Sequence, residues 1–327
     1  PDLFSFLKLS AQDFILLPKK GINIPGSLYS DKLQEKIYLN FLSKIKKLKF
    51  DAIGLSYVQN SKIIKIIKSK TNKIIVSKIE NSLGCKNAKD ISENSDILMI
   101  DRGDLSAEIG ENNLYEQTIN ISKYAKKCGK LLIMATENLE SMISSATPSK
   151  SEIISLSFSK SLNSDYLMLS DETATSKKFL RILKWLNNFN KIEIKNNRSS
   201  RIKNNLDKDI FFSNFVKINE NMSKIVIFTR KGYVIEKLIN INPNLNFFIF
   251  TDNERVYDLS SLRANTNVIK TKKFPKNLYQ FIFENINKNI KEVFDKNTTI
   301  YLVYAAFAKK KSRANTLTIL KKKDFKK

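Results

Sequence analysis

Two short clusters of charged residues are spaced so that they could form one site for an anionic ligand. Lys78 and Glu80 lie two positions apart at the end of an apolar run, so both side chains would point to the same side of a β-strand. Gly103 and Asp104 follow a second apolar run at 97–100. A glycine lets a ligand approach the backbone closely, and free N–H groups at the start of a helix can bind an anion. Together the clusters predict a cation-plus-carboxylate site for a phosphorylated small molecule.

The two carboxylates of this predicted site, Glu80 and Asp104, also suit a metal ion. Mg²⁺ prefers oxygen ligands and seldom has a full cage of protein groups, so two carboxylates can suffice beside substrate oxygens and water. The chain contains no histidine, which excludes an imidazole general base and a histidine-ligated metal. The structural alternatives are a surface ion pair for Lys-x-Glu and an ordinary turn for Gly-Asp. Spacing alone leaves both interpretations open.

Five segments share a pattern that would bring such residues to one edge of a sheet. Each is a short apolar run with polar residues at its carboxyl end, at 51–58, 73–81, 96–105, 130–137 and 165–173. A helical apolar pattern follows each of the first four, which predicts successive βα units of a parallel sheet. Sites in such folds lie at the carboxyl ends of the strands. Thr136, Ser170 and Glu172 would therefore lie at the same edge as the two charged clusters.

Two features of this first block stay open on the sequence alone. A closed (β/α)₈ barrel needs eight units and the block supplies five, so either the sheet is open or three units lie upstream of Pro1. The helix after the fourth segment has two candidate starts. One is Thr147-Pro148, with proline at the first helical position, and the other is a capping box from Ser149 to Glu152.

A second α/β pattern follows the first. We expect strands at 224–229, 246–251, 267–271 and 299–307, an edge strand at 315–321 and a frayed basic tail at 321–327. The polar stretch before them is rich in lysine and asparagine, which predicts a linker. The chain would thus divide into a separate β element at 1–26, a first block at 27–190, a linker at 191–209 and an α/β domain with a mostly parallel sheet at 210–327.

The bulk composition narrows the class of protein. A chain of 327 residues that is 42 % hydrophobic can form two domains with sizeable cores. No run of about 18 apolar residues occurs, so we expect no membrane span. Cys85 and Cys128 suggest neither a disulfide framework nor a metal cluster, and we expect a reducing, cytoplasmic setting. The net charge of +25 raises nucleic-acid binding as an alternative, but the lysines are scattered, and A/T-rich codon usage accounts for them better.

Six motifs, in order and spacing, resemble the pyruvate kinase family. They are KKGINIPG at 19–26, SKIEN at 77–81, DRGDLSAEI at 101–109, ATENLESMI at 135–143, TPSKSE at 147–152 and SDETA at 170–174. The similarity runs from about residue 12 to the C-terminus and weakens after 190. It implies that the first block is the last five units of a TIM barrel and that 1–26 ends the family's lid (B) domain. Three barrel strands and most of the lid would then precede Pro1.

The resemblance also implies a reaction and roles for the predicted site. The family transfers a phosphoryl group from phosphoenolpyruvate to ADP, giving pyruvate and ATP in glycolysis. Lys78 would stabilise charge on the phosphoryl group and the enolate oxygen. Glu80 and Asp104 would bind Mg²⁺, and Thr136 would help to protonate the enolate. Backbone N–H groups near Gly103 would hold the substrate carboxylate.

Further roles follow from the same resemblance. Lys20 would contact the nucleotide, while Arg102, Ser170 and Glu172 would support the site without touching substrate. The family implies a homotetramer and a K⁺ ion, whose ligands would lie upstream of Pro1. No nucleic-acid or membrane partner is expected.

Two acidic substitutions motivate alternative functions. Asp101 stands where the family has a small residue and Asp171 where it has a glycine, and an acid beside the anion-binding turn would weaken substrate binding. The first alternative is therefore a degenerate pyruvate kinase-like protein, retained for binding or assembly without activity. The second is another TIM-barrel enzyme that binds an enolate through Mg²⁺, such as a citrate-lyase-like C–C lyase. The motifs at 135–143 and 170–174 favour pyruvate kinase over the lyase.

Overall fold

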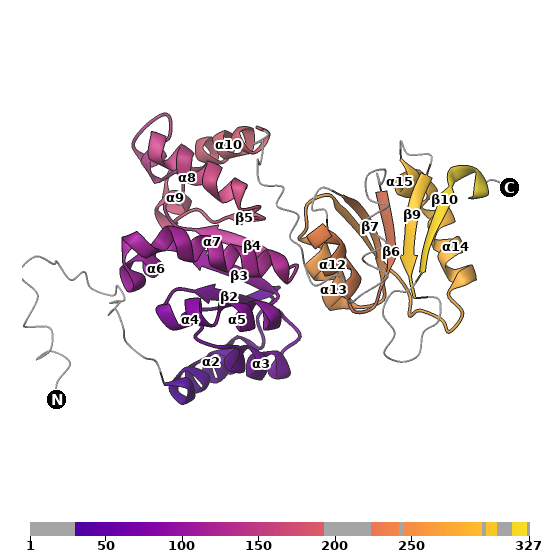
Figure 1. Cartoon of the computed structure of the whole chain (residues 1–327), viewed down its shortest axis with the longest axis horizontal. Helices are drawn as coiled ribbons and strands as arrows, with labels where there is room; N and C mark the ends of the chain where they lie inside the picture. Colours follow the sequence, from indigo (N-terminus) through magenta and orange to yellow (C-terminus); the bar gives the residue numbers. More distant parts are fainter. Residues whose placement is uncertain (1–29, 193–223, 242–244, 296–298, 306–315, 326–327) are drawn as a thin grey trace, which may run out of the picture.

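Two five-stranded sheets form the framework of the chain in the computed structural model (Figure 1). The structure describes residues 30–192, 224–241, 245–295, 299–305 and 316–325. The predicted β element at 1–26 lies outside these residues, as does the predicted linker from 193 onward. The division into domains therefore stays a prediction. None of the helices in the described ranges is long and apolar enough to cross a lipid bilayer.

The first sheet is entirely parallel, with its strands in the order β1-β2-β3-β4-β5. The strands are β1 (Ala52–Leu55), β2 (Ile74–Ile79), β3 (Ile97–Asp101), β4 (Leu131–Ala135) and β5 (Tyr166–Leu167). Consecutive strands are neighbours, as expected of successive βα units. The prediction of an α/β fold with a parallel sheet is confirmed. That these strands are five units of a closed barrel stays a prediction.

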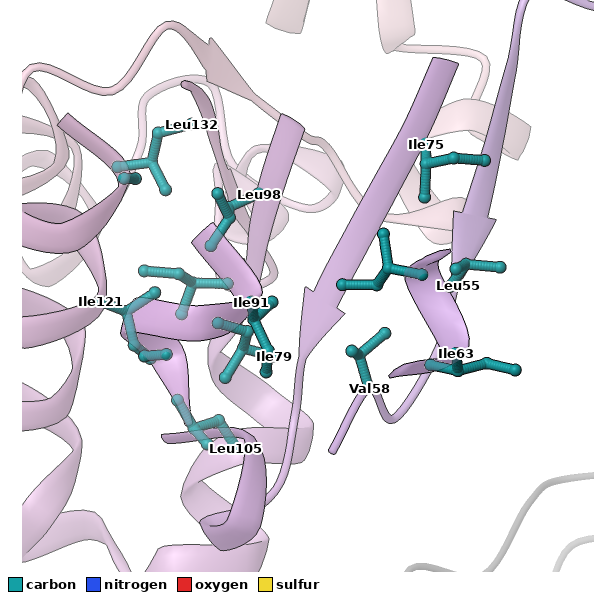
Figure 2. Close-up of a cluster of buried hydrophobic side chains, with 14 of the residues drawn as sticks. Leu55, Val58, Ile63, Ile75, Ile79, Ile91, Leu98, Leu105, Ile121 and Leu132 are labelled. Carbon is teal, nitrogen blue, oxygen red and sulfur yellow. The ribbon is translucent and has the colours of Figure 1, made fainter. Parts of the chain in front are cut away.

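One face of the first sheet is covered by helices. The helical elements of this half are α2 (Asp31–Ile45), α3 (Ser61–Lys70), α4 (Ser82–Lys86), α5 (Ala88–Asn94), α6 (Arg102–Ile109), α7 (Glu111–Lys127), η2 (Glu140–Ile143), α8 (Lys150–Ser161), α9 (Asp171–Thr175) and α10 (Phe179–Asn190). Side chains of α3, α5 and α7 pack against alternate strand residues such as Ile75, Ile79 and Leu98 (Figure 2). Each fully buried side chain of this kind contributes roughly 1.5–3 kcal/mol, so the cluster fixes the register of the strands.

The intervening strand residues form the opposite face of the same sheet. At the amino ends of the strands, Ile74, Ile97 and Leu131 are buried together on this face. Because side chains alternate along a strand, Lys78 and Asp101 belong to the same face at its carboxyl end. The apolar packing therefore directs these two charged side chains away from the helices that cover the sheet.

The start of α8 is a capping box. The N–H of Glu152 donates to Ser149 Oγ at 3.2 Å, and the N–H of Ser149 donates to Glu152 Oε2 at 2.9 Å. Of the two predicted starts, the capping box is therefore correct, and a start at Thr147-Pro148 is wrong. The reciprocal bonds satisfy two donors at once, and Glu152 also accepts from the N–H of Ser141 at 2.9 Å.

The second sheet has the order β10-β9-β6-β7-β8, with β10 antiparallel at its edge. Its strands are β6 (Lys224–Phe228), β7 (Asn246–Thr251), β8 (Thr266–Lys270), β9 (Thr299–Tyr304) and β10 (Thr316–Lys321). Apolar clusters cover both of its faces, one with α12 (Tyr233–Ile241) and α13 (Glu254–Ser261), the other with α14 (Tyr279–Lys288) and α15 (Ile290–Phe294). The predicted mostly parallel sheet with an added edge strand agrees with this topology.

The predicted frayed tail is wrong for residues 322–325. This segment forms a short 3₁₀ helix, η5 (Lys322–Phe325). Phe325 is only 7 % exposed, and its ring packs on Phe283 and Phe294. The lysines of this segment predicted fraying, but the buried ring of Phe325 anchors it. The free energy gained by burying the ring exceeds the entropic cost of ordering a few residues.

The two halves of the chain meet at the amino ends of the first sheet's strands. Arg255 of α13 donates to the carbonyl oxygens of Asn72 and Lys73, each at 2.8 Å, and it contacts Asp96. Lys130 pairs with Glu236 of α12 at 2.8 Å. The carboxyl edge of the same sheet, where the charged clusters lie, is thus the end away from these contacts.

Candidate functional site

β2 ends in the pair that strand alternation predicts. Lys78 Nζ and Glu80 Oε1 form a close ion pair. The Glu80 side chain is fully buried, and the Lys78 side chain is 21 % exposed. The N–H of Tyr57 donates to Glu80 Oε2 at 2.6 Å, which fixes the carboxylate from the side of β1. The Lys-x-Glu motif is therefore no ordinary surface ion pair, because its carboxylate is closed off from solvent.

Asp101, the last residue of β3, brings a second acid to Lys78. Its Oδ2 lies 3.4 Å from Lys78 Nζ. Ile79 and Ile100 are register partners, so Asp101 is level with Glu80 on the neighbouring strand and points to the same face. Asp101 is 6 % exposed, and its Oδ1 has no hydrogen-bond partner among the described residues.

Asp104 completes a group of three acids. It lies in the first turn of α6, directly after β3. One carboxylate oxygen from each of Glu80, Asp101 and Asp104 lies within 4.8 Å of the other two. The structure therefore brings together Glu80 and Asp104, as predicted, and adds Asp101, for which the sequence predicted only a weakening of anion binding. Alternation along β3 could have placed Asp101 on the same face as Ile97, but its position level with Glu80 depends on the register of β2 with β3.

Burial and crowding shift the titration of these groups. Burial raises the pKa of Glu80, and the contacts with Lys78 and the Tyr57 N–H offset this only in part. Burial and the nearby charge of Asp101 raise the pKa of Asp104. Burial alone would lower the pKa of Lys78, but Glu80 and Asp101 outweigh it, so this pKa lies above its ordinary value. Lys78 is thus held as a cation, and the acids favour a further neutralising charge.

Gly103 and Thr136 meet directly. The N–H of Gly103 donates to Thr136 Oγ1 at 2.8 Å, and this hydroxyl donates to the carbonyl of Ala135 at 2.6 Å. Thr136 follows β4 and has a φ of 62°, and Glu137 has a φ of 54°. A β-branched residue rarely adopts this left-handed region, and such strain often marks functional sites. The predicted anion-binding N–H is therefore already paired with the predicted proton-transfer residue.

Arg102 holds the strained turn after β4. Its Nε donates to the carbonyl of Ala135 at 3.2 Å and its Nη2 to Asn138 Oδ1 at 3.1 Å. The guanidinium also contacts the carbonyl of Thr136 and the hydroxyl of Ser155 in α8. Arg102 is only 5 % exposed, so its donors serve the protein. The predicted role of Arg102 in supporting the site stays a prediction.

The structure does not join the remaining predicted residues to the three acids. Ser170 caps the short helix α9, and the N–H of Thr173 donates to its Oγ at 3.4 Å. Glu172 is exposed. Within the described part of the chain, no hydrogen bond or ion pair links either residue to Lys78. Lys20 lies outside the described residues. The predicted roles of these three residues remain predictions.

The donor set fits a magnesium ion. Three buried or half-buried carboxylates supply oxygen ligands from two adjacent strand ends, with one oxygen of each within 4.8 Å of the other two. Within the described residues Asp101 Oδ1 accepts no hydrogen bond, and coordination to a metal ion would satisfy this oxygen instead. Lys78 beside them leaves a positive group for an anionic substrate. The arrangement can hold a divalent cation and an anion side by side.

Comparisons with known proteins agree with the resemblance found in the sequence. The model for the barrel domain of pyruvate kinase matches residues 7–179. The pyruvate kinase of Methanocaldococcus jannaschii is 32 % identical over 177 residues, which cover 53 % of this chain and 40 % of that protein. The pyruvate kinase of Borreliella burgdorferi is 27 % identical over 278 residues, 78 % of this chain and 58 % of that protein. The chain thus spans about half the length of these relatives.

A solved structure shares the fold. The crystal structure of pyruvate kinase from Pyrobaculum aerophilum matches with a TM-score of 0.68 at 22 % sequence identity. The match covers 92 % of this chain and 69 % of the other. It therefore includes both sheets of Figure 1, beyond the residues that the barrel-domain model matches.

Proposed function

The chain belongs to the pyruvate kinase family, and on this basis we propose that it transfers the phosphoryl group of phosphoenolpyruvate to ADP, giving pyruvate and ATP in glycolysis. The observation that carries the proposal is the buried Lys78–Glu80 pair beside Asp104, at the carboxyl edge of the first sheet. Phosphoryl transfer depends mainly on positioning and on stabilising charge, and such a site needs no histidine.

Lys78 is the proposed cation for the developing negative charge. Glu80 and Asp101 hold its ammonium at the end of β2, so little reorganisation is needed when the substrate arrives. Its raised pKa keeps it protonated at neutral pH. From this position it would lie against the phosphoryl group and the enolate oxygen.

Glu80 and Asp104 are the proposed magnesium ligands. When bound, Mg²⁺ would neutralise charge on the phosphoryl and enolate oxygens. Glu80 is held for this role by the N–H of Tyr57, and Asp104 by its place in the first turn of α6. A K⁺ ion is proposed from the family alone, with no ligand assigned among the described residues.

Thr136 and Gly103 are the proposed contacts for the organic part of the substrate. The Gly103 N–H would bind the substrate carboxylate, which requires the Thr136 hydroxyl to release it first. The freed hydroxyl would then face the enolate and assist its protonation. We propose Lys20 for the nucleotide, and Ser170 and Glu172 as supporting residues.

The Lys78→Met variant tests the proposal. We expect kcat for ADP phosphorylation from phosphoenolpyruvate to fall by at least about 100-fold, because a preorganised charge is removed. Lys62→Met, at an exposed position on α3, is the matched control and should keep full turnover. Both variants are compared with the parent protein at saturating Mg²⁺. Retained turnover in Lys78→Met would refute the role of Lys78.

A second function is favoured by one specific observation. Asp101 places a negative charge 3.4 Å from Lys78, where it competes with an anionic substrate. A binding or assembly protein without turnover would tolerate this. Parent protein that binds phosphoenolpyruvate in calorimetry but never phosphorylates ADP would favour this alternative.

The larger organisation is proposed from the family as well. We propose that 1–26 ends a lid domain, that 27–190 belongs to a TIM-barrel domain, and that a linker at 191–209 leads to the domain at 210–327. We further propose a homotetramer in the cytoplasm. Sedimentation of the purified protein tests the tetramer directly.

A further inference from the structure

Asp101 gives this site a third carboxylate, and we propose that it is a direct ligand of the divalent cation, together with Glu80 and Asp104. The inference deepens the proposed function, since it concerns the same cation, but it does not require turnover. It assigns a binding role to a residue that otherwise would only weaken anion binding.

The position of Asp101 supports a ligand role. It ends β3 level with Glu80, so both side chains point to the face of the sheet that also carries Lys78. One of its oxygens lies within 4.8 Å of an oxygen from each of the other two acids. Side-chain adjustment alone, with no change in strand register, would therefore bring all three oxygens to one ion.

The surroundings of Asp101 leave an oxygen without a donor. Asp101 is 6 % exposed, and within the described residues its Oδ1 accepts no hydrogen bond. Its Oδ2 lies 3.4 Å from Lys78 Nζ, at the outer range of an ion pair. Lys78 is closer to Glu80, so it satisfies Asp101 poorly. Buried carboxylates are seldom left in this state unless a cation or water completes them.

The charge of the group leads to the same conclusion. Three carboxylates carry three negative charges and Lys78 carries one positive charge, so two negative charges remain unbalanced. One divalent cation balances this site before any substrate binds. With a small residue at position 101, the cation would leave one positive charge to attract an anion. Asp101 therefore strengthens cation binding and weakens anion binding in this chain.

Mn²⁺ binding in the absence of substrate tests the proposal. Free Mn²⁺ is followed by electron paramagnetic resonance during titration of the parent chain, Asp101→Asn and Glu137→Gln. Asp101→Asn keeps the shape of the side chain and removes its charge. We expect its Kd for Mn²⁺ to rise at least about tenfold. Loss of a residue that only supports a metal ligand already weakens metal affinity by about 10- to 100-fold. Glu137→Gln removes an exposed charge from the turn after β4 and should change Kd less than about twofold.

Thermal unfolding gives a second measurement on the same proteins. Mg²⁺ should raise the Tm of the parent and of Glu137→Gln, because a ligand of the native state stabilises it. Asp101→Asn should show a much smaller rise at equal Mg²⁺, and its own cooperative transition shows that it is folded. Equal Mn²⁺ affinity in Asp101→Asn and the parent, or no Mn²⁺ binding by the parent, would overturn the inference.

The outcomes separate this inference from the proposed function. Tight Mn²⁺ binding that depends on Asp101, without any turnover, would support the third ligand and count against the kinase. Turnover with Mn²⁺ binding that is unaffected by Asp101→Asn would support the kinase and leave Asp101 as an ion-pair partner of Lys78 alone.

Discussion

The two sheets of the molecule use their carboxyl edges in different ways. At the second edge, Asp252 accepts from the Arg230 guanidinium at 3.1 Å and from the N–H of Phe274 at 2.9 Å. The hydroxyls of Thr229 and Thr251 likewise accept backbone N–H groups. At the first edge, three acids crowd around one lysine, and in the described residues such a group occurs at that edge alone.

This difference separates structural polar groups from candidate functional ones. Polar side chains at the second edge accept hydrogen bonds from backbone N–H groups of the adjacent turns. The folded chain therefore satisfies the hydrogen-bonding groups of these side chains. The acids at the first edge repel each other in a buried space, an arrangement that folding alone does not favour. Burial of like charges is therefore the better guide to a site than polarity at a strand end.

The largest expected effect concerns Arg102, a cation at the first edge whose contacts are to the turn after β4. Arg102→Lys removes several donors from the turn after β4 while keeping the positive charge. We expect a loss of about 3 kcal/mol in the free energy of unfolding, because a lysine cannot span the same acceptors. Urea unfolding followed by the fluorescence of Trp185, the only tryptophan, measures it. A loss below about 1 kcal/mol would show that Arg102 supports the turn less than its contacts indicate.

Glu80→Gln should affect the cation far more than the fold. We expect the Mg²⁺ concentration that gives half-maximal turnover, or half of the full rise in Tm, to increase about 10- to 100-fold. Lys78 keeps Asp101 as a partner, so the stability should fall less than in the Asp252 variant described next. Metal titration of turnover and of Tm checks both parts. An unchanged titration would count against Glu80 as a ligand.

Asp252→Ala makes the matching change at the second edge. The variant leaves the N–H of Phe274 without its acceptor, which should cost about 2 kcal/mol of stability. The ion pair with the half-exposed Arg230 adds little. Circular dichroism during urea unfolding measures the loss, and Mn²⁺ affinity is the control that should not change. A changed Mn²⁺ affinity would break the distinction between the two edges.

The smallest expected effect concerns the capping box of α8. Burial would raise the pKa of Glu152, but hydrogen bonds from Ser141 and Ser149 hold it below its ordinary value of 4.5. A carboxyl with a depressed pKa stabilises the fold above the unfolded pKa, and the effect is lost as pH falls through the folded value. Glu152→Gln should therefore cost about 1 kcal/mol at pH 7.

The pH series supplies the check on this prediction. The difference between the parent and Glu152→Gln should shrink once the pH falls below about 4.5, as both side chains become neutral. Glu140→Gln, an exposed position in η2, should differ from the parent by less than about 0.5 kcal/mol at every pH. A constant difference for Glu152→Gln would contradict its assignment to the depressed carboxyl.

Much of the fold and part of the site follow from the sequence. The apolar runs identified all five strands of the first sheet, and alternation placed Lys78 and Glu80 on one face. The edge strand β10 was also predicted. These features depend on local periodicity, which a sequence records directly.

The rest depends on contacts between distant segments. Asp101 joined the site through the register of β2 with β3, and composition carries no record of register. The bond between Gly103 and Thr136 spans 33 positions and depends on a left-handed turn that a threonine would not predict. Phe325 was assigned to a frayed tail because the rings that bury it lie far away in the chain.

The bond from Gly103 to the Thr136 hydroxyl has a calorimetric consequence. If the substrate carboxylate binds the Gly103 N–H, this donor exchanges the Thr136 hydroxyl for a new acceptor. The number of hydrogen bonds that the Gly103 N–H makes therefore stays constant. The enthalpy gained there should be small, and discrimination between an acid and its neutral ester should come from charge. With the proposed metal ion bound, that discrimination would be set by the balance between the ion, Lys78 and the three acids, so adding salt should weaken it more than warming does.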